Sequence, residues 1–237
     1  MVTVINCAAI ICGGILGMLF GNFLKERYQQ SLMTATALCV LFIGIAGTLQ
    51  EMLIVIDGRL SGGGTMMVIA SFAIGSLIGE WLNLEYHIER FGEWLKIKTK
   101  NSNDSSFVDG FVTASLTVCI GAMAVVGAIQ DGIAGDYSIL AAKAVLDLII
   151  IMVMTASMGK GCMFSTIPVG IFQGSITLLA QFIKPFMTAA ALSNLSLVGS
   201  MMIFCVGANL FWQMKIRVAN MLPALVIAVL WAFFPIA

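Results

Sequence analysis

A small set of ionisable and amide side chains lies inside an otherwise apolar chain, at spacings that allow some of them to interact. Lys143 and Asp147 are four residues apart, so in a helix they lie on one face, one turn apart, and can form an ion pair. Two amide–acid neighbours and two further amides occur in other apolar segments: Gln50 with Glu51, Gln130 with Asp131, Gln173, and Asn209. Carboxylate and amide oxygens suit Na⁺ or a proton, whereas the Lys143 ammonium suits the carboxylate of an anionic solute.

The composition assigns these groups to a membrane protein. Of the 237 residues, 60% are hydrophobic and 10% are charged, and the mean hydropathy is +1.03. A water-soluble domain of this size could not bury so much apolar surface in one core. Twelve Lys and Arg balance twelve Asp and Glu, so no overall positive field would attract nucleic acid, and nucleic-acid binding is excluded as a function.

The hydrophobic pattern predicts an all-α fold, a polytopic transmembrane bundle. A bilayer core about 30 Å thick requires about 20 apolar residues per helix. Cutting the chain at its polar clusters predicts one transmembrane domain over residues 1–237 with about eight spans. Pro168 predicts a kinked or broken sixth helix, because proline lacks a backbone donor. The predicted spans are residues 4–24, 32–56, 65–84, 107–130, 139–158, 162–183, 195–212 and 219–236.

The distribution of basic residues indicates how the chain is oriented. Nine of the twelve Lys and Arg lie in the loops after the first, third, fifth and seventh spans, whereas the loops on the other side carry only Arg59 and Lys184. Cytoplasmic loops are enriched in Lys and Arg. We therefore expect a protein of the cytoplasmic membrane with both termini outside the cytoplasm.

Residues 85–106 form the one long polar connection. At helical spacing, Phe91, Trp94 and Lys98 lie on one face of its first part, and Glu89 lies on another. This pattern predicts a helix at the cytoplasmic surface of the lipid bilayer, followed by a linker.

Two internal echoes involve glycine. The segment Gly47-Thr48-Leu49-Gln50-Glu51 resembles Gly127-Ala128-Ile129-Gln130-Asp131, and Gly17-x-x-x-Gly21-Asn22 resembles Gly75-x-x-x-Gly79-Glu80. The first echo is compatible with an internal repeat or with chance in an apolar alphabet. Small residues at such spacing let helix backbones approach closely, so they indicate packing within the chain or the seam of a homodimer.

The polar groups inside the spans have two interpretations. A charge in the middle of a membrane helix costs about 2.5–3.5 kcal/mol on insertion scales, so each needs a partner or a purpose. One interpretation gathers the eight residues Gln50, Glu51, Gln130, Asp131, Lys143, Asp147, Gln173 and Asn209 into a polar cavity that binds an ion or a solute. The other makes them structural ion pairs and interhelical hydrogen bonds.

Several motifs together resemble a known family. They are the stretch 119–132, Lys143-x-x-x-Asp147, Gln173-Gly174, Gly79-Glu80-Trp81 and Ala219-Asn220-x-x-Pro223-Ala224. Over nearly its whole length the chain is similar to the uncharacterised bacterial multi-pass membrane proteins of the YqgA/YdfK type, a family defined as a domain of unknown function. The resemblance implies a bacterial cytoplasmic membrane and a transport role. Its pattern positions coincide with Gln130, Asp131, Lys143, Asp147 and Gln173.

The sequence therefore favours an ion-coupled secondary transporter whose partners are a small solute and a monovalent cation or proton. Motifs for phosphate binding, serine nucleophiles, zinc sites and dinucleotides are absent. We expect no enzyme activity, no cofactor and no resident metal. A membrane scaffold or sensor without transport activity and a passive ion channel are the alternatives.

Overall fold

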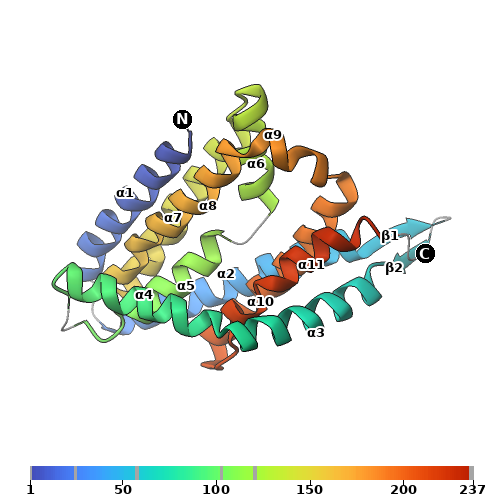
Figure 1. Ribbon diagram of the computed structural model, residues 1–237. Coiled ribbons are helices and arrows are strands. Elements are labelled where there is room, and N and C mark those ends of the chain that lie inside the picture. Colours follow the sequence, from blue (N-terminus) through green and yellow to red (C-terminus); the bar gives the residue numbers. More distant parts are fainter. Residues whose placement is uncertain (1, 24–25, 57–58, 102–103, 120–121, 235–237) are drawn as a thin grey trace.

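The computed structural model describes residues 2–23, 26–56, 59–101, 104–119 and 122–234, which form a bundle of helices (Figure 1). The predicted all-α fold class is confirmed. The helices are α1 (Val2–Phe23), α2 (Glu26–Met52), α3 (Thr65–Leu82), α4 (Leu84–Lys98), α5 (Phe107–Cys119), α6 (Ala122–Ala134), α7 (Ser138–Met158), α8 (Thr166–Leu178), α9 (Ala180–Ile183), α10 (Ala189–Trp212) and α11 (Pro223–Trp231). Three short 3₁₀ helices connect them: η1 (Lys160–Ser165), η2 (Lys184–Phe186) and η3 (Val218–Met221).

Six helical segments in the described chain are long and apolar enough to cross a membrane. They are Val2–Gly21, Gln30–Met52, Thr65–Leu82, Ser138–Met158, Lys160–Leu178 and Ala189–Trp212. The fourth and eighth predicted spans correspond to shorter apolar helices, Phe107–Cys119 and Val218–Trp231. The residues at both ends of the chain, 1 and 235–237, lie outside the described part, so the side on which the termini lie stays a prediction.

The fourth predicted span differs from the prediction because it is divided. A single helix was expected over residues 107–130, but the described helices α5, up to Cys119, and α6, from Ala122, run in different directions (Figure 1). Residues 120–121 of the predicted span lie outside the described part. With about 1.5 Å per residue, α5 alone is about 20 Å long and too short for the bilayer core.

The sixth predicted span, which contains Pro168, changes from the 3₁₀ helix η1 to the α-helix α8 at Thr166. Pro168 is in the first turn of α8, where a missing backbone donor costs least.

The second predicted span also ends differently. The prediction continued this helix to Ile56, but α2 ends at Met52, and Leu53–Ile56 pairs antiparallel with Arg59–Gly62 in a small sheet, β1 and β2. The sequence after Met52 is rich in β-branched residues and is followed by Asp57-Gly58, a pair typical of tight hairpins. Asp57 and Gly58 themselves lie outside the described residues. Figure 1 shows that the hairpin extends beyond the helices.

Glycines hold the long helices together in pairs. Along α1, Gly13, Gly17 and Gly21 lie against the backbone of α7, and both helices run in the same direction. Along α2, Gly44 and Gly47 lie against α10, which runs in the opposite direction. A Cβ atom at most of these positions would overlap the partner helix. The packing interpretation of Gly17 and Gly21 is therefore confirmed, whereas a homodimer stays a prediction that needs another surface.

A third glycine seam joins two of the sequence motifs. Gly75 and Gly79 of α3 lie against the backbone of Ala224 and Asn220, at the start of α11 and in η3. The Asn220 side-chain oxygen also accepts a hydrogen bond of 2.7 Å from the backbone nitrogen of Glu85 in α4. The Glu85 carboxylate accepts one of 3.2 Å from the backbone nitrogen of Ala219. The hydrogen bonds with Asn220 and Ala219 fix the start of α4. Burial raises the pKa of the Glu85 carboxyl group.

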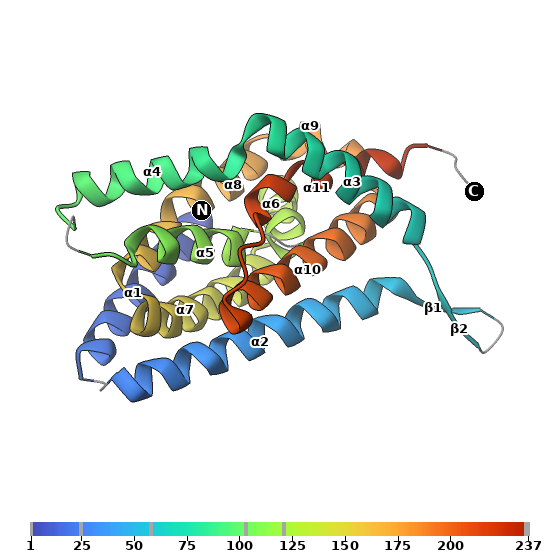
Figure 2. The same cartoon turned by 90° about the horizontal axis from the view of Figure 1, so that it is seen from below.

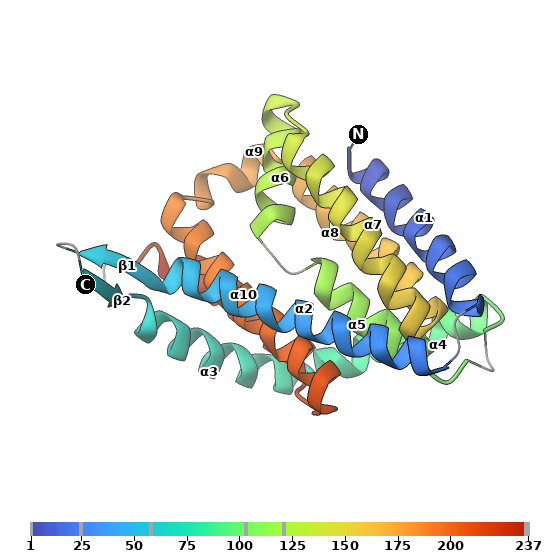
Figure 3. The same cartoon turned by 180° about the vertical axis from the view of Figure 1, so that it is seen from behind.

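The helices form two groups around a central space. In Figure 1, α1, α7 and α8 lie on one side and α3, α10 and α11 on the other. Figure 2 shows α3 and α4 along one edge of the bundle and α2 along the opposite edge. From behind, α2 crosses both groups and packs against α10 and α7 (Figure 3). The α4 helix occupies part of the predicted 85–106 connection, while its depth in a bilayer stays a prediction.

The α3–η3 seam leads to a testable difference between two glycines. Gly79→Ala should destabilise the protein by about 1–3 kcal/mol, because the new Cβ would overlap the Asn220 backbone oxygen and the helices would have to separate. Gly174→Ala is a matched control in α8, where no atom lies within 4 Å of the new Cβ. It should be neutral or stabilise by up to about 1 kcal/mol through helix propensity. Thermal unfolding of the purified variants in detergent measures both, and equal melting temperatures would contradict the seam.

Candidate functional site

The Lys143–Asp147 pair predicted from the sequence is present in the interior of the bundle. Both residues lie on α7, and the Lys143 Nζ is 2.5 Å from the Asp147 Oδ2. The two residues are 7% and 3% exposed. Such a buried pair is stable only when its remaining donors and acceptors also find partners.

Lys143 finds a second partner at the end of α5. Its Nζ donates a hydrogen bond of 2.8 Å to the backbone oxygen of Val118, one residue before the helix ends. The last carbonyl groups of a helix lack partners within the helix and carry its partial negative charge. The Lys143 ammonium therefore stabilises an end of α5 inside the bundle, at the point where the predicted fourth span is divided.

Asp147 finds its second partner on α1. The Asn6 Nδ2 donates to the Asp147 Oδ2 at 3.0 Å and to the Gln173 Oε1 of α8 at 3.1 Å. Asn6 and Gln173 are completely buried. Side chains from α1, α7 and α8, together with the end of α5, thus form one hydrogen-bonded group, here called the polar cluster: Asn6, Lys143, Asp147, Gln173 and the Val118 carbonyl.

The polar cluster retains unused hydrogen-bonding capacity. Among the described residues, neither the Asn6 Oδ1 nor the Gln173 Nε2 has a partner. A buried amide atom without a partner costs about 1–3 kcal/mol. The cluster therefore has a free oxygen acceptor and a free nitrogen donor beside a carboxylate, which are groups that a cation or a small polar molecule can use.

The other predicted residues lie elsewhere. Glu51, at the end of α2, accepts a hydrogen bond of 2.6 Å from the Ser193 Oγ of α10, and Gln50 beside it is exposed. Gln130 and Asp131 lie in the second half of α6, where both are partly buried. Thus Lys143, Asp147 and Gln173 are the three predicted residues that share the polar cluster.

The Asn209 side chain stabilises the backbone of a connection between helices. Its Nδ2 donates to the backbone oxygen of Ile216 at 2.8 Å, and its Oδ1 accepts from the Ile216 backbone nitrogen at 2.9 Å. These two hydrogen bonds close the connection between α10 and η3. The described contacts of Asn209 thus provide hydrogen-bond partners for backbone groups of the turn that follows α10.

Sequence reasoning missed Asn6 and the Val118 carbonyl. Asn6 lies near the start of the first apolar segment, and the cost of a buried amide, the signal used for Gln173, applies to it equally. The Val118 carbonyl could not be found in the same way, because it becomes a free acceptor only where the helix ends.

Within the described residues, no group of three or more His, Cys, Asp or Glu side chains is arranged to hold a metal ion. The described cysteines are unpaired. The oxygen atoms of the polar cluster come from one carboxylate, two side-chain amides and one backbone carbonyl. That donor set fits a weakly held monovalent cation or a proton better than a resident transition metal, which needs nitrogen or sulfur ligands.

The partners of the pair predict how its variants behave. Lys143→Met should destabilise the protein by about 3–5 kcal/mol, because Asp147 would stay buried without a positive charge. The double variant Lys143→Met/Asp147→Asn should recover most of this loss, since both charges are absent and residue 147 can still accept from Asn6. Unfolding in detergent measures both variants.

A charge swap gives the matching control. Lys143→Asp/Asp147→Lys would place a carboxylate against the Val118 oxygen and an ammonium against the Asn6 Nδ2. It should therefore fail to restore stability. Full recovery in the swapped protein would show that the contacts to Val118 and Asn6 contribute little.

Comparison with known proteins agrees with this architecture. The family model described as "Protein of unknown function (DUF554)" matches residues 1–233. The chain is 31% identical to the uncharacterised membrane protein YdfK of Bacillus subtilis over 225 residues, 95% of this chain and 92% of the relative. It is also 31% identical to the uncharacterised protein YqgA of Escherichia coli over 228 residues, 94% and 92% of the two chains. No solved structure matches the chain. This chain is a membrane protein that belongs to the DUF554 family.

Proposed function

We propose that the protein is an ion-coupled secondary transporter of a small solute in the bacterial cytoplasmic membrane, with both termini outside the cytoplasm. The observation that carries this proposal is the polar cluster, in which a buried Lys–Asp pair lies beside unsatisfied amide atoms of Asn6 and Gln173. Ionisable residues buried among membrane helices are typical of ion and substrate pathways.

The cluster supplies two states with different charge arrangements. In one state Lys143 and Asp147 neutralise each other. In the other, a proton or a monovalent cation binds at Asp147, and Lys143 is left with the Val118 carbonyl. A coupled carrier needs at least two such states, whose populations the ion can shift through its different affinity for each.

The division between α5 and α6 can couple the charge state of the polar cluster to a change in conformation. Lys143 holds the end of α5, so a change in its pairing also changes the force on that helix end. Discontinuous helices near ion sites recur in secondary transporters, where helix ends face the transported groups. The proposal therefore assigns the moving part to the end of α5.

The scaffold interpretation loses one of its supports. A scaffold could bind its partner through the glycines spaced along the helices, but Gly17 and Gly75 lie against α7 and α11 of the same chain. The passive channel differs from the carrier in two respects, since a channel tolerates the loss of Lys143 and conducts without coupling.

Asp147→Asn should abolish coupled flux, and it should also lower the melting temperature, because Lys143 stays buried without a negative charge. Flux is therefore compared in protein that elutes as a single folded species. The new amide can still accept hydrogen bonds from Lys143 and Asn6, but it cannot bind a proton or compensate the lysine charge. Proteoliposomes that contain a pH-sensitive dye measure the response of wild type to a panel of small organic solutes, under proton and Na⁺ gradients. Asp109→Asn, at an exposed carboxylate in the first turn of α5, is the matched control and should behave as wild type.

The same measurements separate the alternatives. Thermal unfolding against Na⁺, K⁺, pH and the solute panel should show a ligand that stabilises wild type by mass action and fails to stabilise Asp147→Asn. Flux that persists without coupling in Lys143→Met would indicate a channel. No flux and no stabilisation in wild type across the panel would contradict transport and favour the scaffold or sensor.

A further inference from the structure

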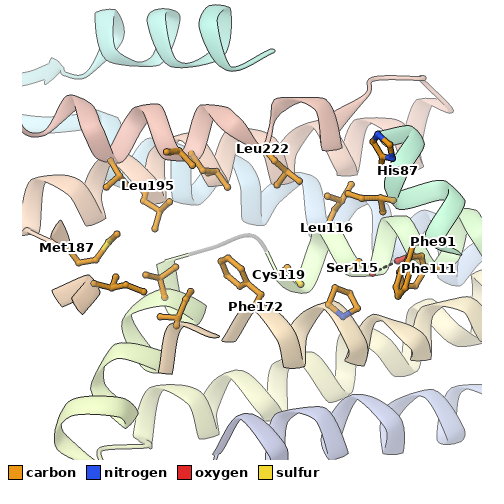
Figure 4. Close-up of a pocket in the computed structure, with 18 residues that line it drawn as sticks. His87, Phe91, Phe111, Ser115, Leu116, Cys119, Phe172, Met187, Leu195 and Leu222 are labelled. Carbon is orange, nitrogen blue, oxygen red and sulfur yellow. Dashed lines mark hydrogen bonds between the residues drawn. The ribbon is translucent and has the colours of Figure 1, made fainter. Parts of the chain in front are cut away.

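A large apolar cavity lies between the two helix groups (Figure 4), and the polar cluster does not line it. Its volume is about 740 Å³, within the range of about 300–1,000 Å³ typical of ligand sites. Nearly all of its lining is apolar, and the hydroxyl of Ser115 is already bonded to the Phe111 backbone oxygen. The cavity thus offers hydrophobic surface and almost no groups that could bind water.

Three helices supply most of the walls of the cavity. Its lining runs from Phe111 to Cys119 on α5, from Pro168 to Ile176 on α8, and from Leu222, just before α11, to Val229 on that helix. At about 1.5 Å per residue, each wall extends over about 10–12 Å. In Figure 4, His87 and Met187 mark the opposite ends of the cavity.

An apolar cavity of this size needs an apolar occupant. Water would find almost no hydrogen-bond partners there, and an empty space would deprive the lining of dispersion contacts. Phe172 of α8 and Val226 of α11 line the cavity and are 40% and 61% exposed. Their neighbours Ile171 and Leu230 are also exposed and apolar, so the opening faces hydrocarbon.

One exposed face of α4, beside the cavity, carries the cationic side chains of Arg90 and Lys98. With 100° per residue, His87, Arg90, Trp94 and Lys98 share one exposed face of α4, whereas Glu89 lies on the far side. Of these four residues His87 lines the cavity, as does the nearby Phe91. A face of basic and aromatic side chains is suited to the phosphate and glycerol region of an anionic lipid.

We propose that the cavity binds one acyl chain of an anionic phospholipid, which enters from the bilayer between α8 and α11, with its phosphate at His87 and Arg90 of α4. Glu89 lies on the far side of α4 from this phosphate position. The hydrogen bonds of Glu85 to η3 hold α4 beside the end of the cavity. This lipid site does not depend on ion coupling at Asp147.

Palmitoyl-oleoyl phosphatidylglycerol is the probe for this site. When this lipid is added to delipidated protein in detergent, native mass spectrometry should show one bound lipid per chain. The melting temperature of the protein should rise by several degrees. Ile176→Trp fills the cavity from α8 and should abolish both effects. Ile171→Trp is the matched control on the same helix, at an exposed position outside the lining, and should respond as wild type.

A second pair of variants guards against misfolding and tests the headgroup. Val229→Phe fills the cavity from α11 and should also abolish the response, provided that it elutes as a single species like wild type. Arg90→Ala/Lys98→Ala should keep binding but lose the preference for phosphatidylglycerol over phosphatidylcholine.

Three outcomes would overturn the proposal. The first is an unchanged lipid response in both cavity-filling variants. The second is an equal response to palmitate alone, which would identify a free fatty acid as the ligand. The third is a wild-type dimer in light scattering that both filling variants convert to a monomer, which would identify a second copy of the chain as the occupant.

Discussion

The burial of the Lys143 ammonium governs the arrangement of the helices around it. An ammonium in a region without water needs acceptors from the protein, and it finds the Asp147 carboxylate and the Val118 carbonyl. The first acceptor requires only a helical turn of α7. The second requires that α5 ends beside α7, so the charge on one helix and the end of another are stabilised together.

Close helix packing makes this arrangement possible. The parallel seam of α1 and α7, with glycines on α1, brings Asn6 within 3.0 Å of Asp147. The antiparallel seam of α2 and α10 builds the other group, and α3 joins it through η3. Within each group, glycines let the helix backbones pack closely. Between the groups the contacts are made by side chains, and the apolar cavity lies there.

The polar cluster and the apolar cavity share two walls. Val118 contributes its carbonyl to the cluster and the next residue, Cys119, lines the cavity. On α8, Gln173 belongs to the cluster and the preceding Phe172 lines the cavity. An occupant of the cavity would therefore press on the same helix segments that hold the buried charges. This adjacency links the proposed lipid site physically to the proposed ion site, although each proposal rests on its own contacts.

Local sequence determined the membrane class, the helical fold and the Lys143–Asp147 pair, because hydrophobicity and a spacing of four residues act within one helix. Cost arguments also singled out Gln173, but they could not say which polar residues meet. Asn6 reaches Asp147 and Gln173 only through the packing of α1 against α7 and α8, and Glu51 meets Ser193 instead. The end of α5 and the cavity were likewise decided by tertiary structure, since each depends on which neighbours are present to satisfy or cover the chain. The β1–β2 hairpin instead follows a local signal, the β-branched residues before Asp57-Gly58.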